Sequence, residues 1–160
     1  KLLRYKDKKS VKFVEIKIKK IMTNKIELSW KGQMLFESVA PEGNVMIDAA
    51  EEVGGQGKGL RPKALMLTSL AGCSAMDVVS LLKKMRAEVD DFRIEVIANL
   101  TDEHPKFYDK VHVIYRFYGS DFKKDKIEKS VNLSEERYCG VMEMFRKFSD
   151  VTTEIIYIEQ

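Results

Sequence analysis

Apolar and polar residues alternate between positions 25 and 49 with the period of two that is typical of β-strands. Two turn sequences, KG at 31–32 and PEGN at 41–44, divide this stretch into segments. One face of the first segment carries Ile26, Leu28 and Trp30. The pattern predicts an antiparallel meander of three short strands, at residues 25–31, 33–39 and 44–49.

The segment 64–86 follows a different pattern, because its first two-thirds are apolar or small at nearly every position. Pro62 precedes it and suits the first turn of a helix, where its missing N–H costs nothing. A helix that is apolar all round must be buried all round. One domain of 160 residues has difficulty covering such a helix. The pattern therefore predicts a long central helix that a second subunit helps to bury, and hence a homodimer.

Alternation returns in the second half of the chain, within 92–100 and 110–119. The predicted inward faces of these two strands carry Phe92, Ile94, Val96 and Ala98, and Val111, Val113, Tyr115 and Phe117. An amphipathic helix is predicted over 123–130, and a second helix over 134–148, with Ser134 as its N-cap. A last strand closes the chain at 151–159. Strands, a long helix, two strands, a helical pair and a strand make an α+β fold.

Composition narrows the class of protein. The chain is 44% apolar and 33% charged, which is ordinary for a globular domain. It has no charge-free apolar run of about 18 residues and no secretory signal, so we expect a cytoplasmic protein that does not span a membrane. Two cysteines and two histidines, far apart in the sequence, indicate neither a disulfide framework nor a metal site.

The basic segment 1–22 differs from everything that follows. Its first 20 residues carry nine Lys and Arg against two Asp and Glu, a net charge of +7, so the other 140 residues sum to −4. Such a segment could be an arm for nucleic acid or an anionic membrane. It could equally be an extension, foreign to the natural protein, ahead of a start at Met22. We favour the extension, with 23–160 as the domain, and we expect no nucleic-acid partner.

A glycine-rich loop covers residues 51–62 and contains four glycines. Such loops can cradle phosphate, but this one lacks the P-loop order and no GKS or GKT follows. A connector between the meander and the long helix is the favoured interpretation.

Three motifs in order carry a family resemblance. They are RPKALMLTSLAGCSAMDVVSLL at 61–82, DEHPKF at 102–107 and LSEERYCGV at 133–141. Together they resemble the OsmC/Ohr family of osmotically inducible and organic-hydroperoxide-resistance proteins, and more closely its OsmC-like branch. The resemblance covers residues 24–158. It implies an intertwined homodimer in which a curved, antiparallel-rich sheet surrounds a long central helix.

The same resemblance implies thiol-dependent reduction of organic hydroperoxides without a cofactor. By position, Cys73 would be the peroxidatic thiol and Cys139 the resolving thiol. The first would form a sulfenic acid, the second would condense with it to a disulfide, and an external dithiol would reduce the pair again.

Activation of Cys73 needs a cation, because the thiolate is the reactive form and an apolar setting disfavours it. Members of the family supply an arginine from the first strands and a glutamate after the proline that opens the helix. This sequence has no arginine between 23 and 60 and no carboxylate directly after Pro62. Arg61 is the nearest substitute. The remaining candidate residues of the substrate site are Glu52, Lys63, Asp77 and Tyr138.

Two functions from different classes stay open at this point. One is the thiol peroxidase. The other is a non-catalytic dimer that binds an apolar ligand and keeps both cysteines for packing, since free cysteine is often buried for packing alone.

Overall fold

The computed structural model describes residues 3–7, 10–14 and 23–160. Its strands are β1 (Leu3–Asp7), β2 (Ser10–Val14), β3 (Glu27–Gly32), β4 (Leu35–Ala40), β5 (Gly43–Ile47), β6 (Asp91–Leu100), β7 (Tyr108–Gly119) and β8 (Asp150–Glu159). Its helices are the 3-10 turn η1 (Glu51–Val53), α1 (Pro62–Met85), α2 (Lys124–Leu133), the π-helical turn η2 (Ser134–Tyr138) and α3 (Gly140–Phe145). This is the predicted α+β order of elements.

The basic N-terminal segment contains an antiparallel pair, β1 with β2. Residues 11–14 of β2 lie opposite residues 3–6 of β1. Residues 15–22, which complete the predicted extension, lie outside the described residues.

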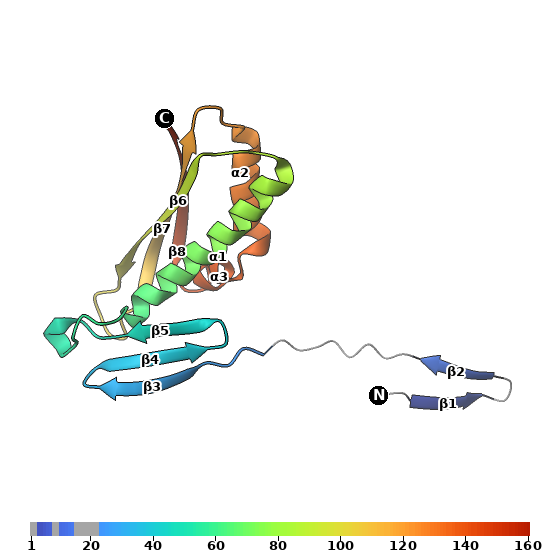
Figure 1. Ribbon diagram of the computed structural model, residues 1–160, viewed down its shortest axis with the longest axis horizontal. Helices are drawn as coiled ribbons and strands as arrows, with labels where there is room; N and C mark the ends of the chain where they lie inside the picture. Colours follow the sequence, from blue (N-terminus) through green and yellow to red (C-terminus); the bar gives the residue numbers. More distant parts are fainter. Residues whose placement is uncertain (1–2, 8–9, 15–22) are drawn as a thin grey trace.

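The predicted meander is confirmed as the sheet β3–β4–β5, in which neighbouring strands are antiparallel (Figure 1). Its register places Trp30 opposite Phe36, and Phe36 opposite Ile47, so one face is apolar. Leu28 and Trp30 on that face are 52% and 68% exposed. The chain therefore leaves an apolar sheet face uncovered.

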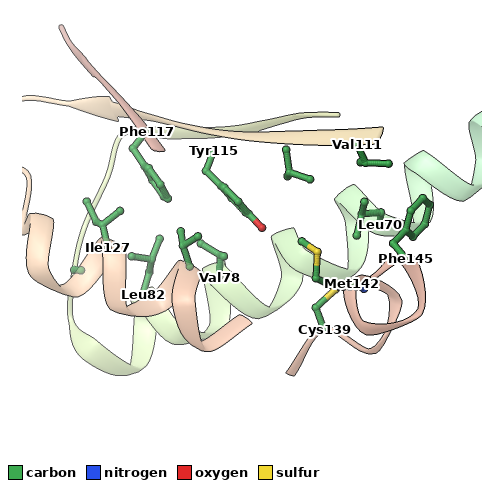
Figure 2. Close-up of a cluster of buried hydrophobic side chains, with 13 residues drawn as sticks. Leu70, Val78, Leu82, Val111, Tyr115, Phe117, Ile127, Cys139, Met142 and Phe145 are labelled. Carbon is green, nitrogen blue, oxygen red and sulfur yellow. Dashed lines mark hydrogen bonds between the residues drawn. The ribbon is translucent and has the colours of Figure 1, made fainter. Parts of the chain in front are cut away.

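The second sheet, β6–β7–β8, forms the core with the helices. β6 pairs antiparallel with β7, and β7 pairs parallel with β8. The predicted inward faces are confirmed: Phe92 lies opposite Phe117 and Ile94 opposite Tyr115. The helices α1, α2 and α3 lie on one face of this sheet (Figure 1). In Figure 2, Phe117 and Tyr115 extend from the sheet toward the helices.

Helix α1 buries one side and exposes the other. Leu70 and Val78 are fully buried against the second sheet, whereas Met76 is 71% exposed and Met66 and Val79 are exposed as well. Among the described residues, α1 is the helix that is long and apolar enough to cross a membrane, with a mean hydropathy of 1.7 over 18 residues. The core helix of a soluble protein meets the same criterion, and the buried side of α1 fits that role. The prediction that α1 is buried on every side is confirmed for the side that packs on the second sheet. The other side of α1 is exposed in this single chain.

The glycine-rich loop is ordered by Asp48, which is 1% exposed. Its carboxylate accepts hydrogen bonds from the backbone N–H groups of Ala49 (2.8 Å), Gln56 (2.8 Å) and Lys58 (3.1 Å). The Gln56 N–H is the largest of the causes that hold the pKa of Asp48 below its usual value. A Cβ on Gly55 would lie 2.0 Å from the carbonyl oxygen of Ala49, so the chain needs glycine there. The loop is thus a fixed connector that sets where α1 begins.

We predict that Asp48→Asn lowers the stability at neutral pH, with a melting temperature lower by several degrees. Because the folded pKa lies below the unfolded value of about 3.9, the carboxylate stabilises the fold above that pH. The stabilisation is lost as the pH falls through the folded pKa. Urea unfolding of both proteins at several pH values should show their difference shrinking below about pH 4.

The matched control is Asp102→Asn, which alters an exposed carboxylate in the turn between β6 and β7. A difference between Asp48→Asn and the unchanged protein that is constant from neutral to acid pH would contradict the role assigned to the Asp48 charge.

Candidate functional site

The two cysteines, 66 residues apart in sequence, meet in the structure. Cys73 lies in the middle of α1 and is half-buried, and Cys139 lies between η2 and α3 with 3% of its surface exposed. The two Sγ atoms and a carboxylate oxygen of Asp77 all lie within 4.8 Å of one another. Asp77 is one helical turn from Cys73, on the same side of α1. The site is thus built from one helix and one break between helices.

The break at Cys139 differs from the sequence prediction. The prediction of a helix from Ser134 to Phe148 is wrong, and so is the prediction that Ser134 is its N-cap. Helix α2 continues to Leu133 and passes directly into η2, and Ser134 has helical dihedral angles. Cys139 is extended (φ −74°, ψ 93°) and is itself the N-cap of α3, with Sγ accepting the Met142 N–H at 3.3 Å. The break places the Cys139 sulfur at α1.

Buried hydroxyl groups connect the elements around the two sulfurs. Ser74 Oγ lies 2.8 Å from the Tyr115 hydroxyl and 3.1 Å from Ser134 Oγ. Ser134 Oγ in turn donates to Asp77 Oδ2 at 3.5 Å. This hydroxyl network joins α1, β7 and η2, and competition from these tertiary partners explains why Ser134 does not cap a helix. Sequence reasoning missed Ser74, although a serine beside Cys73 in an apolar helix is a recognisable signal.

The electrostatic setting keeps Cys139 protonated. Burial, the neighbouring Cys73 thiol and the Asp77 charge raise the pKa of Cys139 to about 12, and the Met142 N–H offsets this only in part. No Lys or Arg of the described residues is among the main causes of this shift. Cys139 is therefore a thiol, not a thiolate, at neutral pH.

A second buried acid, Glu135, was also missed, because the sequence placed it in an exposed first turn. In the structure Oε1 is buried without a hydrogen-bond partner, and burial raises the pKa of the carboxyl group. Arg146 donates to the Glu135 carbonyl oxygen at 2.7 Å and approaches Oε2 at 3.4 Å. These contacts join η2 to the end of α3.

Arg61 and Lys63 are not part of the sulfur cluster within one chain. Arg61 is the exposed residue before α1, and twelve residues of helix put it about 18 Å from Cys73 along the axis. Both side chains line a groove of about 410 Å³ with Ala50, Leu100 and other residues. Their roles as activating and substrate-binding cations stay predictions that require a second chain.

Glu52 and Tyr138 are exposed residues. Glu52 is exposed in η1, and among the described residues no ion pair joins it to Arg61. The Tyr138 side chain is half exposed, and the Arg137 guanidinium lies 5.7 Å from the centre of its ring. Of the predicted site residues, the structure brings together Cys73, Cys139 and Asp77.

Known proteins resemble this chain over most of its folded part. Residues 55–154 match the family model "OsmC-like protein". Protein YhfA of Escherichia coli K12 is 33% identical over 91 residues, which is 57% of this chain and 68% of YhfA.

Solved structures share the fold. A hypothetical protein from Aquifex aeolicus VF5 is 28% identical, with a TM-score of 0.77 over 88% of this chain and 99% of its own. The organic hydroperoxide resistance protein OhrB of Bacillus subtilis is 20% identical, with a TM-score of 0.60 over 84% of this chain and 98% of its own. The family model covers more than half of the residues here, including both cysteines, so the chain belongs to the OsmC-like family.

Proposed function

We propose that this protein is a thiol-dependent peroxidase that reduces organic hydroperoxides. The observation that carries the proposal is the meeting of Cys73 and Cys139, whose sulfur atoms lie within 4.8 Å of each other. Membership of the OsmC-like family supports a peroxide-related redox role. The fold shared with an organic hydroperoxide resistance protein points in the same direction.

The difference in exposure supports the division of roles between the two cysteines. Cys73 is half-buried, so its sulfur can be reached by a small peroxide, whereas Cys139 is 3% exposed. The Cys73 thiolate attacks an oxygen of the hydroperoxide, the O–O bond breaks, and the alkoxide takes a proton and leaves as an alcohol. Cys73 is thereby oxidised to a sulfenic acid.

The second step forms a disulfide. The Cys139 sulfur loses its proton and attacks the Cys73 sulfur, and the sulfenic oxygen leaves as water. A disulfide needs an S–S distance of about 2.05 Å, so the sulfurs must approach by less than about 3 Å. An external dithiol then reduces the disulfide by exchange. A reducing compartment such as the cytoplasm suits this cycle, which uses no cofactor.

A homodimer completes this proposal. The apolar face of β3–β5 and the exposed side of α1, with Met66, Met76 and Val79, are the surfaces that a second copy would cover. An intertwined arrangement would also bring the partner's Arg61 or Lys63 toward Cys73, whereas within one chain both residues lie at the start of α1, away from Cys73. Burying these surfaces stabilises the pair by the hydrophobic effect.

A second candidate function is non-catalytic binding of an apolar ligand. The observation that favours it is the charge around the thiols: the Asp77 charge helps to raise the pKa of Cys139, and no described Lys or Arg is among the main causes of that shift. Without a cation from a partner, such thiols would be unreactive and would serve packing.

We predict that the reduced protein loses both thiols on addition of cumene hydroperoxide, in a reaction that Cys73→Ser abolishes. Cys139→Ser should react once and stop at a sulfenic acid, because the resolving sulfur is missing. Thiol titration and mass spectrometry after trapping with dimedone measure both outcomes. Thiols of the unchanged protein that survive excess peroxide would refute the proposal and favour the ligand-binding alternative.

We predict that Cys139 of the folded, reduced protein reacts with iodoacetamide at least about a hundredfold more slowly than in the urea-unfolded chain. Its pKa of about 12 leaves far less thiolate than the usual value of about 8.5, and its sulfur is buried. Peptide mass spectrometry of the Cys73→Ser variant isolates the rate at Cys139. Equal rates in the folded and unfolded protein would contradict its assignment as the protected, resolving thiol.

We predict that Trp30→Glu converts the dimer to a monomer, because it places a charge on the apolar face of β3–β5. Sedimentation velocity at several concentrations measures the change. Glu27→Lys is the control: it also alters charge on β3, but Glu27 is in the register of the opposite face. A monomeric unchanged protein, or the same association state in both variants, would contradict the proposed interface.

A further inference from the structure

The cluster of Cys73, Cys139 and Asp77 has the composition of a metal site as well as that of a redox pair. Two thiol sulfurs and one carboxylate oxygen lie within 4.8 Å of one another. Two of the donors are four residues apart on α1, and the third comes from the break before α3. Donors from two separate elements that converge on one point are typical of protein metal sites.

We propose that the reduced site binds a thiophilic divalent cation of the Zn²⁺ class through Cys73 Sγ, Cys139 Sγ and a carboxylate oxygen of Asp77. Three protein ligands leave one position of a tetrahedron for water or another small ligand. Sulfur ligands select Zn²⁺ and related soft ions over Mg²⁺ and Ca²⁺, which prefer oxygen.

The distances are compatible with this geometry. Zinc–sulfur bonds of about 2.3 Å in a tetrahedron set the two sulfurs about 3.7 Å apart. The donors therefore need to close by about 1 Å at most from their present limit of 4.8 Å.

The charge of the site favours a cation. The Asp77 carboxylate lies beside both sulfurs. On binding, the two thiols release their protons to solvent, and the cation takes two thiolates and one carboxylate as ligands. The cation then supplies the positive charge that the described chain does not place beside its thiols. Ser134 Oγ donates a hydrogen bond to Asp77 Oδ2 at 3.5 Å, and this bond would orient the carboxylate toward the cation.

The site does not depend on peroxide reduction, because binding needs only the reduced thiols and Asp77. If the protein also reduces peroxides, metal and peroxide compete for the same sulfurs. The disulfide form would bind no metal, so oxidation would release the cation.

The test is a titration of the fully reduced protein with Co²⁺ in the absence of oxygen, followed by displacement with Zn²⁺. We expect a sulfur-to-cobalt charge-transfer band and the intense visible bands of tetrahedral Co²⁺, saturating at one ion per chain. Competition with a chromophoric chelator gives the Zn²⁺ affinity. Asp77→Asn should weaken Zn²⁺ binding at least about tenfold, by the scale of losses at such sites. The Cys73–Cys139 disulfide form should show neither band.

Asp102→Asn is the matched control and should bind as the unchanged protein does. Cys139→Ala and Cys139→Ser should both lose tight binding, and thermal melting with circular dichroism identifies a variant that does not fold. If neither folds, Asp77→Asn and the disulfide form decide the question.

Three results would overturn the inference: a weak, octahedral cobalt spectrum, unchanged affinity in Asp77→Asn, or Zn²⁺ binding that survives oxidation of both thiols. The peroxide assay on the same preparations separates the two ideas. Metal binding without peroxide reduction refutes the peroxidase alone, and the reverse result refutes the metal site alone.

Discussion

The contact between the middle of α1 and the helix break at Cys139 is the interaction on which the site depends. It is held from three sides: Ser74 contacts the hydroxyls of Tyr115 and Ser134, Ser134 donates to Asp77, and the Met142 N–H fixes the Cys139 sulfur. Each of these groups is buried or half-buried, so an unmade hydrogen bond would leave a polar group without a partner at a cost of about 1–3 kcal/mol. The network therefore specifies one alignment of η2 on α1, and with it the separation of the two sulfurs.

The alignment creates a conflict between packing and reactivity. A buried thiol fits an apolar core well, but burial and the adjacent Asp77 disfavour the thiolate that any chemistry needs. The two cysteines differ in exposure, so this conflict between packing and reactivity affects them to different degrees. Cys73 is half-buried, whereas Cys139 is buried and its raised pKa keeps it a thiol at neutral pH. A resolving thiol tolerates such a setting better than an attacking thiol does.

Periodicity predicted the frame of the fold but not the site. The pairing of Phe92 with Phe117 follows from alternation, because a period of two leaves one apolar face and thereby sets the register. The break at Cys139 does not follow from local rules: Ser134 has the local features of an N-cap, and only its tertiary partners explain why it lies inside a continuous helical run. Gly140 was a local sign of the break. Cys73 and Asp77 meet Cys139 because α1 packs against η2, and the spacing of residues along the sequence does not show this packing. The expectation of no metal site rested only on the distance between the cysteines and histidines along the chain.

Charge balance connects the site with the exposed surfaces of the chain. Two thiols and one carboxylate lie together, while the predicted activating cations, Arg61 and Lys63, are held at the start of α1 by the loop that Asp48 orders. A rigid connector fixes these cations about three helical turns from their own Cys73, so internal motion of the loop is a poor way to complete the site. With Arg61 and Lys63 held at this distance, a source outside the chain is another way to bring a positive charge to the thiols. A second copy can deliver it by covering the apolar side of α1, and a thiophilic cation can deliver it directly. The two solutions differ in consequence: a guanidinium beside Cys73 favours a free thiolate ready to attack, whereas a bound metal ion keeps both sulfurs as ligands until it leaves.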